Sequence, residues 1–231
     1  MRTTTIAILA LALLGAGCSD DDTPTPDQRV QTDQAAPLPD AGADRAAPVE
    51  LGAPDLSPAD ALAPDTAFVC SPPAQPGELY ALFASTGVRD ISLCEYRGRV
   101  LLIVNIAAKC GYTPQLGKLA TLHKTYEAQG LTVLGFYSDQ FNQAGTEQEQ
   151  QSCEASYGVT FPTFPDVNVN PPNEDPVFTW LKAQPGGAGP VLWNFEKFLV
   201  SRDGALLQRW ATAVEPDAAQ VVSAIQAALA P

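Results

Sequence analysis

Two long apolar runs, separated by a helical pattern, constrain the fold of this chain more than any other feature. Residues 100–107 form one run and residues 131–137 form the other, and both have strand length. Continuous runs of this kind are typical of strands that are buried on both faces of a sheet. Between them, apolar residues recur at helical spacing from Leu116 to Tyr126, and Gly130 marks the end of the helix. Strand, helix and strand in this order predict a right-handed parallel β-α-β unit.

The segments around this unit extend the prediction to a whole domain. We predict short strands within 77–85 and 88–99, helices that begin at Thr113-Pro114, Thr146, Pro176 and Pro216, and strands at 195–202 and 206–211. The last two strands form a hairpin, because Asp203-Gly204 between them is a strong turn signal. These elements predict an α/β, thioredoxin-like fold, in which a central mixed sheet is flanked by helices.

The first 17 residues have the features of a secretory signal peptide. One arginine precedes an apolar run that is too short to span a bilayer stably, and small residues lead to Cys18. The stretch LGAGC at 14–18 resembles a bacterial lipobox, in which the cysteine is acylated and becomes the first mature residue. We therefore predict lipidation of Cys18 and an extracytoplasmic, membrane-anchored lipoprotein. An ordinary signal peptide cut near Ala16 is the alternative.

Residues 18–69 are predicted to be a disordered tether. Pro, Ala and Asp dominate, so this segment buries too little apolar surface to offset its ordering entropy. Residues 19–69 hold eleven acidic and two basic side chains, which is −9 of the chain's net charge of −13. The acidity therefore belongs to the tether, and it argues against a nucleic-acid partner. Folding is left to residues 70–231, a usual length for one compact domain.

A cysteine lies where the first buried strand gives way to the helix. Functional groups gather at the carboxyl ends of central strands, and a helix N-terminus favours the thiolate, the nucleophilic form of Cys110. Lys109 adds a positive charge. The alternative, a structural cysteine, would be expected inside the apolar run. Cys110 is therefore the candidate nucleophile.

Thr113 occupies the position where a Cys-x-x-Cys pair would have its second thiol. Because local dithiol exchange is impossible, the thiolate must first attack another partner. A hydroperoxide fits this role, since it converts a thiolate to a sulfenic acid that another cysteine can resolve. Two alternatives stay open, a thioredoxin-like thiol-disulfide oxidoreductase and a non-enzymatic redox sensor.

Three motifs, in order, resemble those of the glutathione peroxidase family. NIAAKCGYTPQL (105–116) is similar to the peroxidatic motif usually written NVASKCG, GFYSDQF (135–141) resembles GFPCNQF, and WNFEKF (193–198) repeats WNF-x-KF. The resemblance implies a thiol peroxidase for hydrogen peroxide or organic hydroperoxides. It assigns the catalytic tetrad to Cys110, Gln140, Trp193 and Asn194. Amide and indole N–H groups suit this role, because they stabilise developing charge without titrating near neutrality.

The resemblance also implies how the oxidised thiol is reduced. Cys153 matches the resolving cysteine of the family's thioredoxin-dependent members, and its disulfide with Cys110 would require local unwinding of the 146–157 helix. The loop at 184–192 is short, whereas tetrameric glutathione-using members carry a longer insertion there. The resemblance thus implies a monomer with a thioredoxin-like reductant. Asp139 departs from the asparagine usual beside Gln140, and we expect it to face away from the thiolate.

The remaining cysteines suggest a structural role. Cys70 and Cys94 are hypothesised to form a disulfide that pins the start of the domain, as an exported protein would tolerate, although spacing alone does not prove it. His123 is the only histidine, and neither a Cys/His cluster nor a Gly-rich phosphate loop is present in the sequence. We therefore expect no metal and no cofactor.

Overall fold

The computed structural model describes residues 70–165 and 167–230. The predicted signal peptide (1–17), the lipidation at Cys18 and the tether (18–69) lie outside the described residues. Among the residues that are described, no helix is long and apolar enough to cross a membrane.

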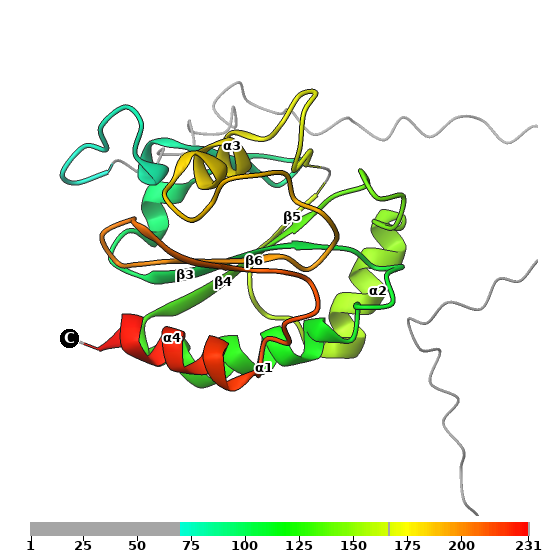
Figure 1. The fold of residues 1–231 in the computed structure, drawn as a ribbon. Coiled ribbons are helices and arrows are strands. Elements are labelled where there is room, and N and C mark those ends of the chain that lie inside the picture. The colour runs from blue at the N-terminus through cyan, green and yellow to red at the C-terminus, as the bar shows by residue number, and fades with distance from the viewer. Residues whose placement is uncertain (1–69, 166, 231) are drawn as a thin grey trace, which may run out of the picture. The chain divides into compact units, whose positions relative to one another are not determined.

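A five-stranded mixed sheet forms the centre of the domain (Figure 1). Its strands, in spatial order, are β5 (Thr163–Phe164), β4 (Leu131–Tyr137), β3 (Val100–Ile106), β6 (Lys197–Val200) and β7 (Leu206–Trp210). The predicted β-α-β unit is confirmed, because β3 and β4 pair in parallel. β6 pairs antiparallel with both β3 and β7, which completes the mixed sheet and the predicted hairpin.

Helices cover both faces of this sheet. In Figure 1, α1 (Gln115–Tyr126) and α4 (Ala219–Leu229) lie below it and α3 (Pro176–Ala183) lies above it. Every residue of β3 and β4 is buried, so their alternating side chains fill two separate cores. The core beneath α3 also packs against the hairpin of β1 (Phe83–Ser85) and β2 (Asp90–Ser92).

Local sequence signals determine where two helices begin and end. α2 (Glu147–Tyr157) starts with a capping box, in which the Thr146 hydroxyl accepts from the Glu149 N–H and the Glu149 carboxylate accepts from the Thr146 N–H. Gly158 ends this helix in the left-handed conformation, at φ 66°. Asp175 caps α3 in a similar way, with Pro176 in the first turn.

The structure corrects several predicted boundaries. α1 begins at Gln115 rather than at Thr113, because residues 111–114 form turns held by bonds such as the Thr113 N–H to the Cys110 carbonyl (2.8 Å). The last predicted helix starts at Ala219 rather than at Pro216. Phe195 cannot extend β6, because its φ of 65° lies outside the strand region.

The predicted strands near the start of the domain are partly wrong. Two short 3₁₀ helices, η2 (Leu79–Ala81) and η3 (Leu93–Tyr96), occupy parts of those segments. Each buries two adjacent residues, which a half-buried strand with alternating faces does not do. A third 3₁₀ helix, η4 (Glu127–Gln129), continues α1 and stops at Gly130, as predicted, with φ 105°. β5 was not predicted, since two residues carry no periodicity.

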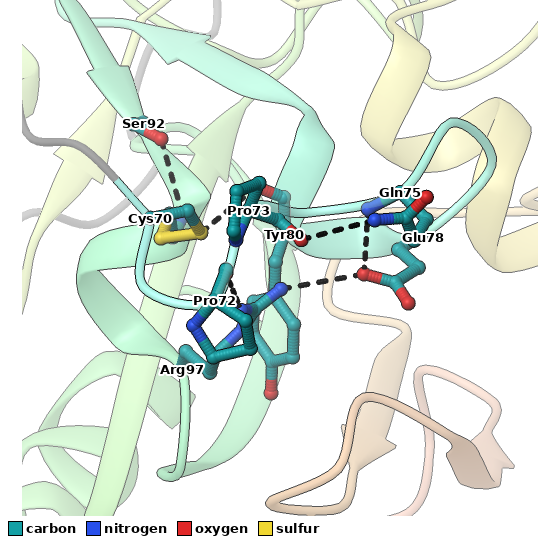
Figure 2. Close-up of a disulfide and its surroundings, with 9 residues drawn as sticks. Cys70, Pro72, Pro73, Gln75, Glu78, Tyr80, Ser92 and Arg97 are labelled. Atoms are coloured by element: carbon teal, nitrogen blue, oxygen red, sulfur yellow. Dashed lines mark hydrogen bonds and ion pairs between the residues drawn. A yellow bond between two sulfur atoms is a disulfide. The ribbon is translucent and has the colours of Figure 1, made fainter.

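A disulfide joins Cys70 to Cys94 across a Cα–Cα distance of 5.6 Å, which confirms that hypothesis. Figure 2 shows Arg97 beside it, reaching the carbonyl of Pro72 and the carboxylate of Glu78, with 3.3 Å between charged atoms of the latter pair. Arg97 also lies over the Tyr80 ring, 5.2 Å from its centroid. The first described residues are therefore held against η3 by a covalent bond and by Arg97.

Replacing both Cys70 and Cys94 by serine is expected to lower the free energy of unfolding by about 3 kcal/mol, because the bond closes a loop in the unfolded chain. The loop spans 24 residues. Urea denaturation of the oxidised wild type and the double variant measures this difference. Reduced wild type serves as the control and should match the variant; equal stability of the oxidised and reduced wild type would contradict the prediction.

Candidate active site

Cys110 lies in the turn between β3 and α1, at the strand-to-helix junction that the sequence indicates. Its side chain is a free thiol that is only 4% exposed. The Tyr112 N–H lies 3.5 Å from Sγ and donates to it. Thr113 Oγ1 accepts from the Cys110 N–H (3.0 Å) and donates to the Ala107 carbonyl (2.9 Å). The hydroxyl at the second-cysteine position therefore fixes the turn that carries the thiol.

The loop after β4 holds the Cys110 turn in place and connects it to Asn194. The carbonyls of Ala144 and Gln143 accept from the N–H groups of Ala108 (3.1 Å) and Lys109 (3.0 Å). The Gln143 side chain then accepts from Asn194 Nδ2 at 3.0 Å. Asn194 is fully buried, and its Oδ1 has no hydrogen-bond partner among the described residues. The structure thus places Asn194 one side chain away from the Cys110 turn.

Gln140 is held in one orientation by the backbone of a distant residue. Its Nε2 donates to the Asn170 carbonyl (2.7 Å), and its Oε1 accepts from the Asn170 N–H (2.8 Å). A flip of the amide would lose both bonds, since it would set donor against donor and acceptor against acceptor. One N–H of Nε2 remains as a donor.

Trp193 lies in an exposed apolar group at the surface. Its side chain is 40% exposed and packs on Phe141, the neighbour of Gln140, with 5.3 Å between ring centroids. Within residues 70–165 and 167–230, the indole N–H donates to no acceptor. Leu192, which precedes Trp193, is 73% exposed, and Tyr112, two residues after Cys110, is 37% exposed. The indole is therefore available to a ligand, in an apolar setting.

Asn105 positions this tryptophan and is not among the predicted site residues. It lies fully buried in β3, where Nδ2 donates to the Trp193 carbonyl (3.0 Å) and Oδ1 accepts from the Glu196 N–H (2.9 Å). Its carbonyl accepts from the Phe195 N–H (2.6 Å). The sequence signal for this role is the amide of Asn105 inside an otherwise apolar strand, because a buried polar side chain needs specific hydrogen-bond partners.

A buried ion pair holds the loop that leads to Trp193. Arg209 lies 2.8 Å from Glu196, whose other carboxylate oxygen accepts from the Leu192 N–H at 2.6 Å. The same guanidinium donates to four successive carbonyls, those of Gly187, Ala188, Gly189 and Pro190. Charge-assisted bonds of this kind make a glycine-rich loop rigid.

The other side of Asn194 is held by the segment after β7. Thr212 Oγ1 donates to the Asn194 carbonyl (2.7 Å), and the Thr212 carbonyl accepts from Gln115 (2.9 Å) and from Lys197 (3.1 Å). Burial lowers the pKa of Lys197 to about 8. Its ammonium group, still largely charged at neutral pH, also donates to the Val214 carbonyl (2.5 Å). The position of Asn194 relative to the sheet thus depends on α1 and β6 together.

Cys153 projects from α2 toward the segment that carries Cys110. Its side chain is 2% exposed, and Sγ lies 3.6 Å from the Ala108 carbonyl. An ion pair between Lys109 and Glu149 joins the same two segments, with 2.7 Å between charged atoms. The hydrogen bond from Lys109, followed by that from Thr146, lowers the pKa of Glu149 to about 2. α2 therefore contacts the Cys110 segment near its start and near its middle.

Two other titratable side chains considered in the sequence, Asp139 and His123, have contacts of their own. Asp139 is exposed, and its carboxylate accepts from the Ala144 N–H (3.2 Å) within its own loop. His123 is buried, its Nδ1 accepts from the Val133 N–H (3.4 Å), and burial lowers its pKa. The described part of the chain contains no group of three His, Cys, Asp or Glu side chains that could hold a metal ion.

Comparison with known proteins identifies the family. The family model described as glutathione peroxidase matches residues 79–182, a range that contains Cys110, Gln140 and Cys153. The chain is 43% identical over 128 residues to the glutathione peroxidase-like peroxiredoxin HYR1 of Saccharomyces cerevisiae, covering 53% of this chain and 78% of that one. The chain belongs to the glutathione peroxidase family. It is 43% identical over 138 residues to the hydroperoxy fatty acid reductase gpx1 of Synechocystis, covering 55% and 82% of the two chains.

A solved structure supports both the family and the fold. The crystal structure of Trgpx in its apo form superimposes with a TM-score of 0.54 at 33% identity, over 66% of this chain and 95% of that one. The predicted thioredoxin-like fold and the predicted family are thus confirmed. By family, the protein is a thiol peroxidase of the glutathione peroxidase type. Trp193 and Asn194 lie beyond the matched range of the family model, so their roles rest on the motif and on the geometry described above.

Proposed function

We propose that this thiol peroxidase reduces hydrogen peroxide or organic hydroperoxides with Cys110 as its peroxidatic residue. The observation that carries this assignment is a free thiol in the turn at the end of β3, which accepts the Tyr112 N–H and has no second thiol at position 113. Gln140, Trp193 and Asn194 are the proposed hydrogen-bond donors. The exposed side chains of Leu192 and Trp193, and the relative named as a hydroperoxy fatty acid reductase, support organic hydroperoxides as substrates.

The first step transfers one oxygen atom to sulfur. The Cys110 thiolate attacks the terminal oxygen of the hydroperoxide, the O–O bond breaks, and the leaving alkoxide or hydroxide takes up a proton to become an alcohol or water. Sulfur is oxidised to a sulfenic acid and the hydroperoxide is reduced. Fixed N–H donors lower the barrier, because negative charge develops on the departing oxygen. The remaining N–H of Gln140 and the indole N–H of Trp193 can supply such bonds.

The second step forms a disulfide. In the fully reduced protein, the Cys153 thiol attacks the sulfenic sulfur of Cys110, an S–S bond forms and water leaves. The two sulfurs come from segments that already touch, since Cys153 lies against the Ala108 carbonyl. We expect bond formation to require local unwinding of α2, which the ion pair of Lys109 and Glu149 opposes.

The third step returns both thiols to the reduced form. We assign it to a thioredoxin-like dithiol protein, whose thiolate attacks the disulfide and whose second thiol completes the exchange. The short loop at 184–192 supports this assignment, as does the similarity to a peroxiredoxin-type relative. The short loop also supports a monomeric protein.

We further propose that the domain acts outside the cytoplasm, held to a membrane by a lipid on Cys18. The sequence of residues 1–18 motivates this, and the disulfide of Cys70 with Cys94 supports it, because such bonds persist in oxidising compartments. Palmitate labelling of cells that express the full chain tests the anchor. A Cys18→Ala variant should lose the label, and an unlabelled wild type would contradict the proposal.

Turnover of the wild type with different reductants tests the proposed function. We expect steady consumption of hydrogen peroxide and of cumene hydroperoxide with a thioredoxin system, and at least about tenfold slower consumption with glutathione. Insulin reduction without peroxide would instead favour a thiol-disulfide oxidoreductase. A single oxidation without turnover in any reductant would favour a redox sensor.

A further inference from the structure

Asn170 contacts the segments of two proposed tetrad residues that lie on different loops. Its backbone N–H and carbonyl hold the Gln140 amide at 2.8 and 2.7 Å. Its side chain holds the backbone of Val191, with Oδ1 accepting from the Val191 N–H (2.8 Å) and Nδ2 donating to the Val191 carbonyl (2.8 Å). Val191 is two residues before Trp193. One residue thus fixes Gln140 with its main chain and the approach to Trp193 with its side chain.

The Asn170 side chain is itself fixed by a third contact. Lys182 of α3 donates to Asn170 Oδ1 (3.1 Å) and to the Val169 carbonyl (2.9 Å), and it forms an ion pair with Glu174. Both charged side chains are only 13% exposed. Hydrogen bonds to charged groups in such a setting are stronger than neutral ones, so the amide has little freedom to rotate.

The segment that this amide holds is rich in glycine. Residues 184–192 include glycines at 186, 187 and 189, and two of them have positive φ values, 81° and 95°. Glycine-rich chains lose more conformational entropy on ordering than others do. Arg209 holds residues 187–190, whereas Asn170 holds both polar groups of Val191. Asn170 therefore holds Val191, which lies between the carbonyls bound by Arg209 and Leu192, whose N–H is bound by Glu196.

We propose that Asn170 is a positioning residue for the peroxidase reaction, which couples the placement of Gln140 to that of Trp193. This inference rests on the proposed roles of these two side chains as donors to the reacting oxygen. It predicts that loss of the Asn170 amide displaces the indole without removing any donor. Small displacements of positioned groups reduce rates strongly, by up to about 10²-fold for 1 Å.

Stopped-flow oxidation of Cys110 by hydrogen peroxide tests this coupling. Asn170→Ala is expected to lower the second-order rate constant at least about tenfold. Asn168→Ala, two residues away on the same loop, removes only a bond to the Asn173 carbonyl and should stay within about twofold. In a Trp193→Phe background, Asn170→Ala should cost less than about threefold, because the donor that it positions is already absent.

Hydrogen exchange provides a readout that does not depend on activity. Backbone amides in peptides covering 185–193 should exchange at least about tenfold faster in Asn170→Ala than in the wild type. Their exchange rates should be unchanged in Asn168→Ala. Asn170→Asp keeps the acceptor for the Val191 N–H but sets a carboxylate oxygen against the Val191 carbonyl. If the alanine variant fails to fold, this variant takes its place, and its rate is expected to lie below that of the wild type. A wild-type rate constant in Asn170→Ala would overturn this inference and leave the proposed function standing. A tenfold effect of Asn170→Ala in the Trp193→Phe background would do the same. A wild-type Cys110 that does not react with peroxide would overturn the proposed function, whatever the exchange data show.

Discussion

Replacement of Cys110 by serine is expected to reduce hydroperoxide turnover to background, a loss of at least about 10³-fold. A serine hydroxyl stays protonated near neutrality and attacks an O–O bond poorly, whereas a thiolate is an intrinsically strong nucleophile. The substitution replaces only the sulfur of the buried Cys110 side chain by oxygen, so the fold should persist. A coupled assay with a thioredoxin system measures the loss.

The matched control for this variant is Cys70→Ser/Cys94→Ser, which also replaces sulfur by oxygen. That protein is expected to be less stable and to keep its peroxidase turnover at temperatures where it is folded, because Cys70 packs against one core and Cys110 belongs to the other. Retained turnover in Cys110→Ser, with a circular dichroism spectrum like that of the wild type, would show that another residue carries the reaction.

Replacement of Cys153 by serine is expected to separate the first step from the second. Oxidation of Cys110 by one equivalent of peroxide should proceed within about twofold of the wild-type rate, while steady turnover with thioredoxin should fall by about 10²-fold. The reason is that the sulfenic acid forms normally but finds no second thiol. A cyclic 1,3-dione, which alkylates sulfenic acids, should label Cys110 in this variant and leave the wild type largely unlabelled.

Ser152→Ala, on the exposed side of the same helix, is the control for disturbance of α2. It loses only a bond within the helix, from its hydroxyl to the Gln148 carbonyl at 2.8 Å, and should turn over as the wild type does. Wild-type turnover of Cys153→Ser with thioredoxin would contradict the resolving role and would leave direct reduction of the sulfenic acid by the external dithiol.

The strands and helix ends were predictable wherever a local sequence pattern is compatible with one structure only. Residues 100–107 and 131–137 are apolar throughout most of their length, which fits a strand buried on both faces and little else. Thr146 and Gly158 mark the ends of α2 because capping and the left-handed conformation depend on local chemistry. At Thr113 the same kind of local reasoning was wrong, because the hydroxyl binds the Cys110 turn instead of starting the helix.

The sequence predicts which residues belong to the candidate site, but it does not predict the contacts that hold them in place. The motifs identify Gln140 and Trp193, but the contacts that relate them pass through the backbone and the side chain of Asn170, 30 residues from Gln140 in sequence. No periodicity or turn signal encodes such a contact. Asn105 illustrates the same limit, because its partners on either side of Phe195 are defined only when the sheet has formed.

The most direct test of the account is mass spectrometry of the wild type after one equivalent of hydrogen peroxide, with peptide mapping under non-reducing conditions. A peptide pair joined through Cys110 and Cys153, with the loss of two hydrogens, is the predicted product, next to an unchanged Cys70–Cys94 pair. An unmodified Cys110 thiol in peroxide-treated protein would contradict the central claim that this residue is where the hydroperoxide is reduced.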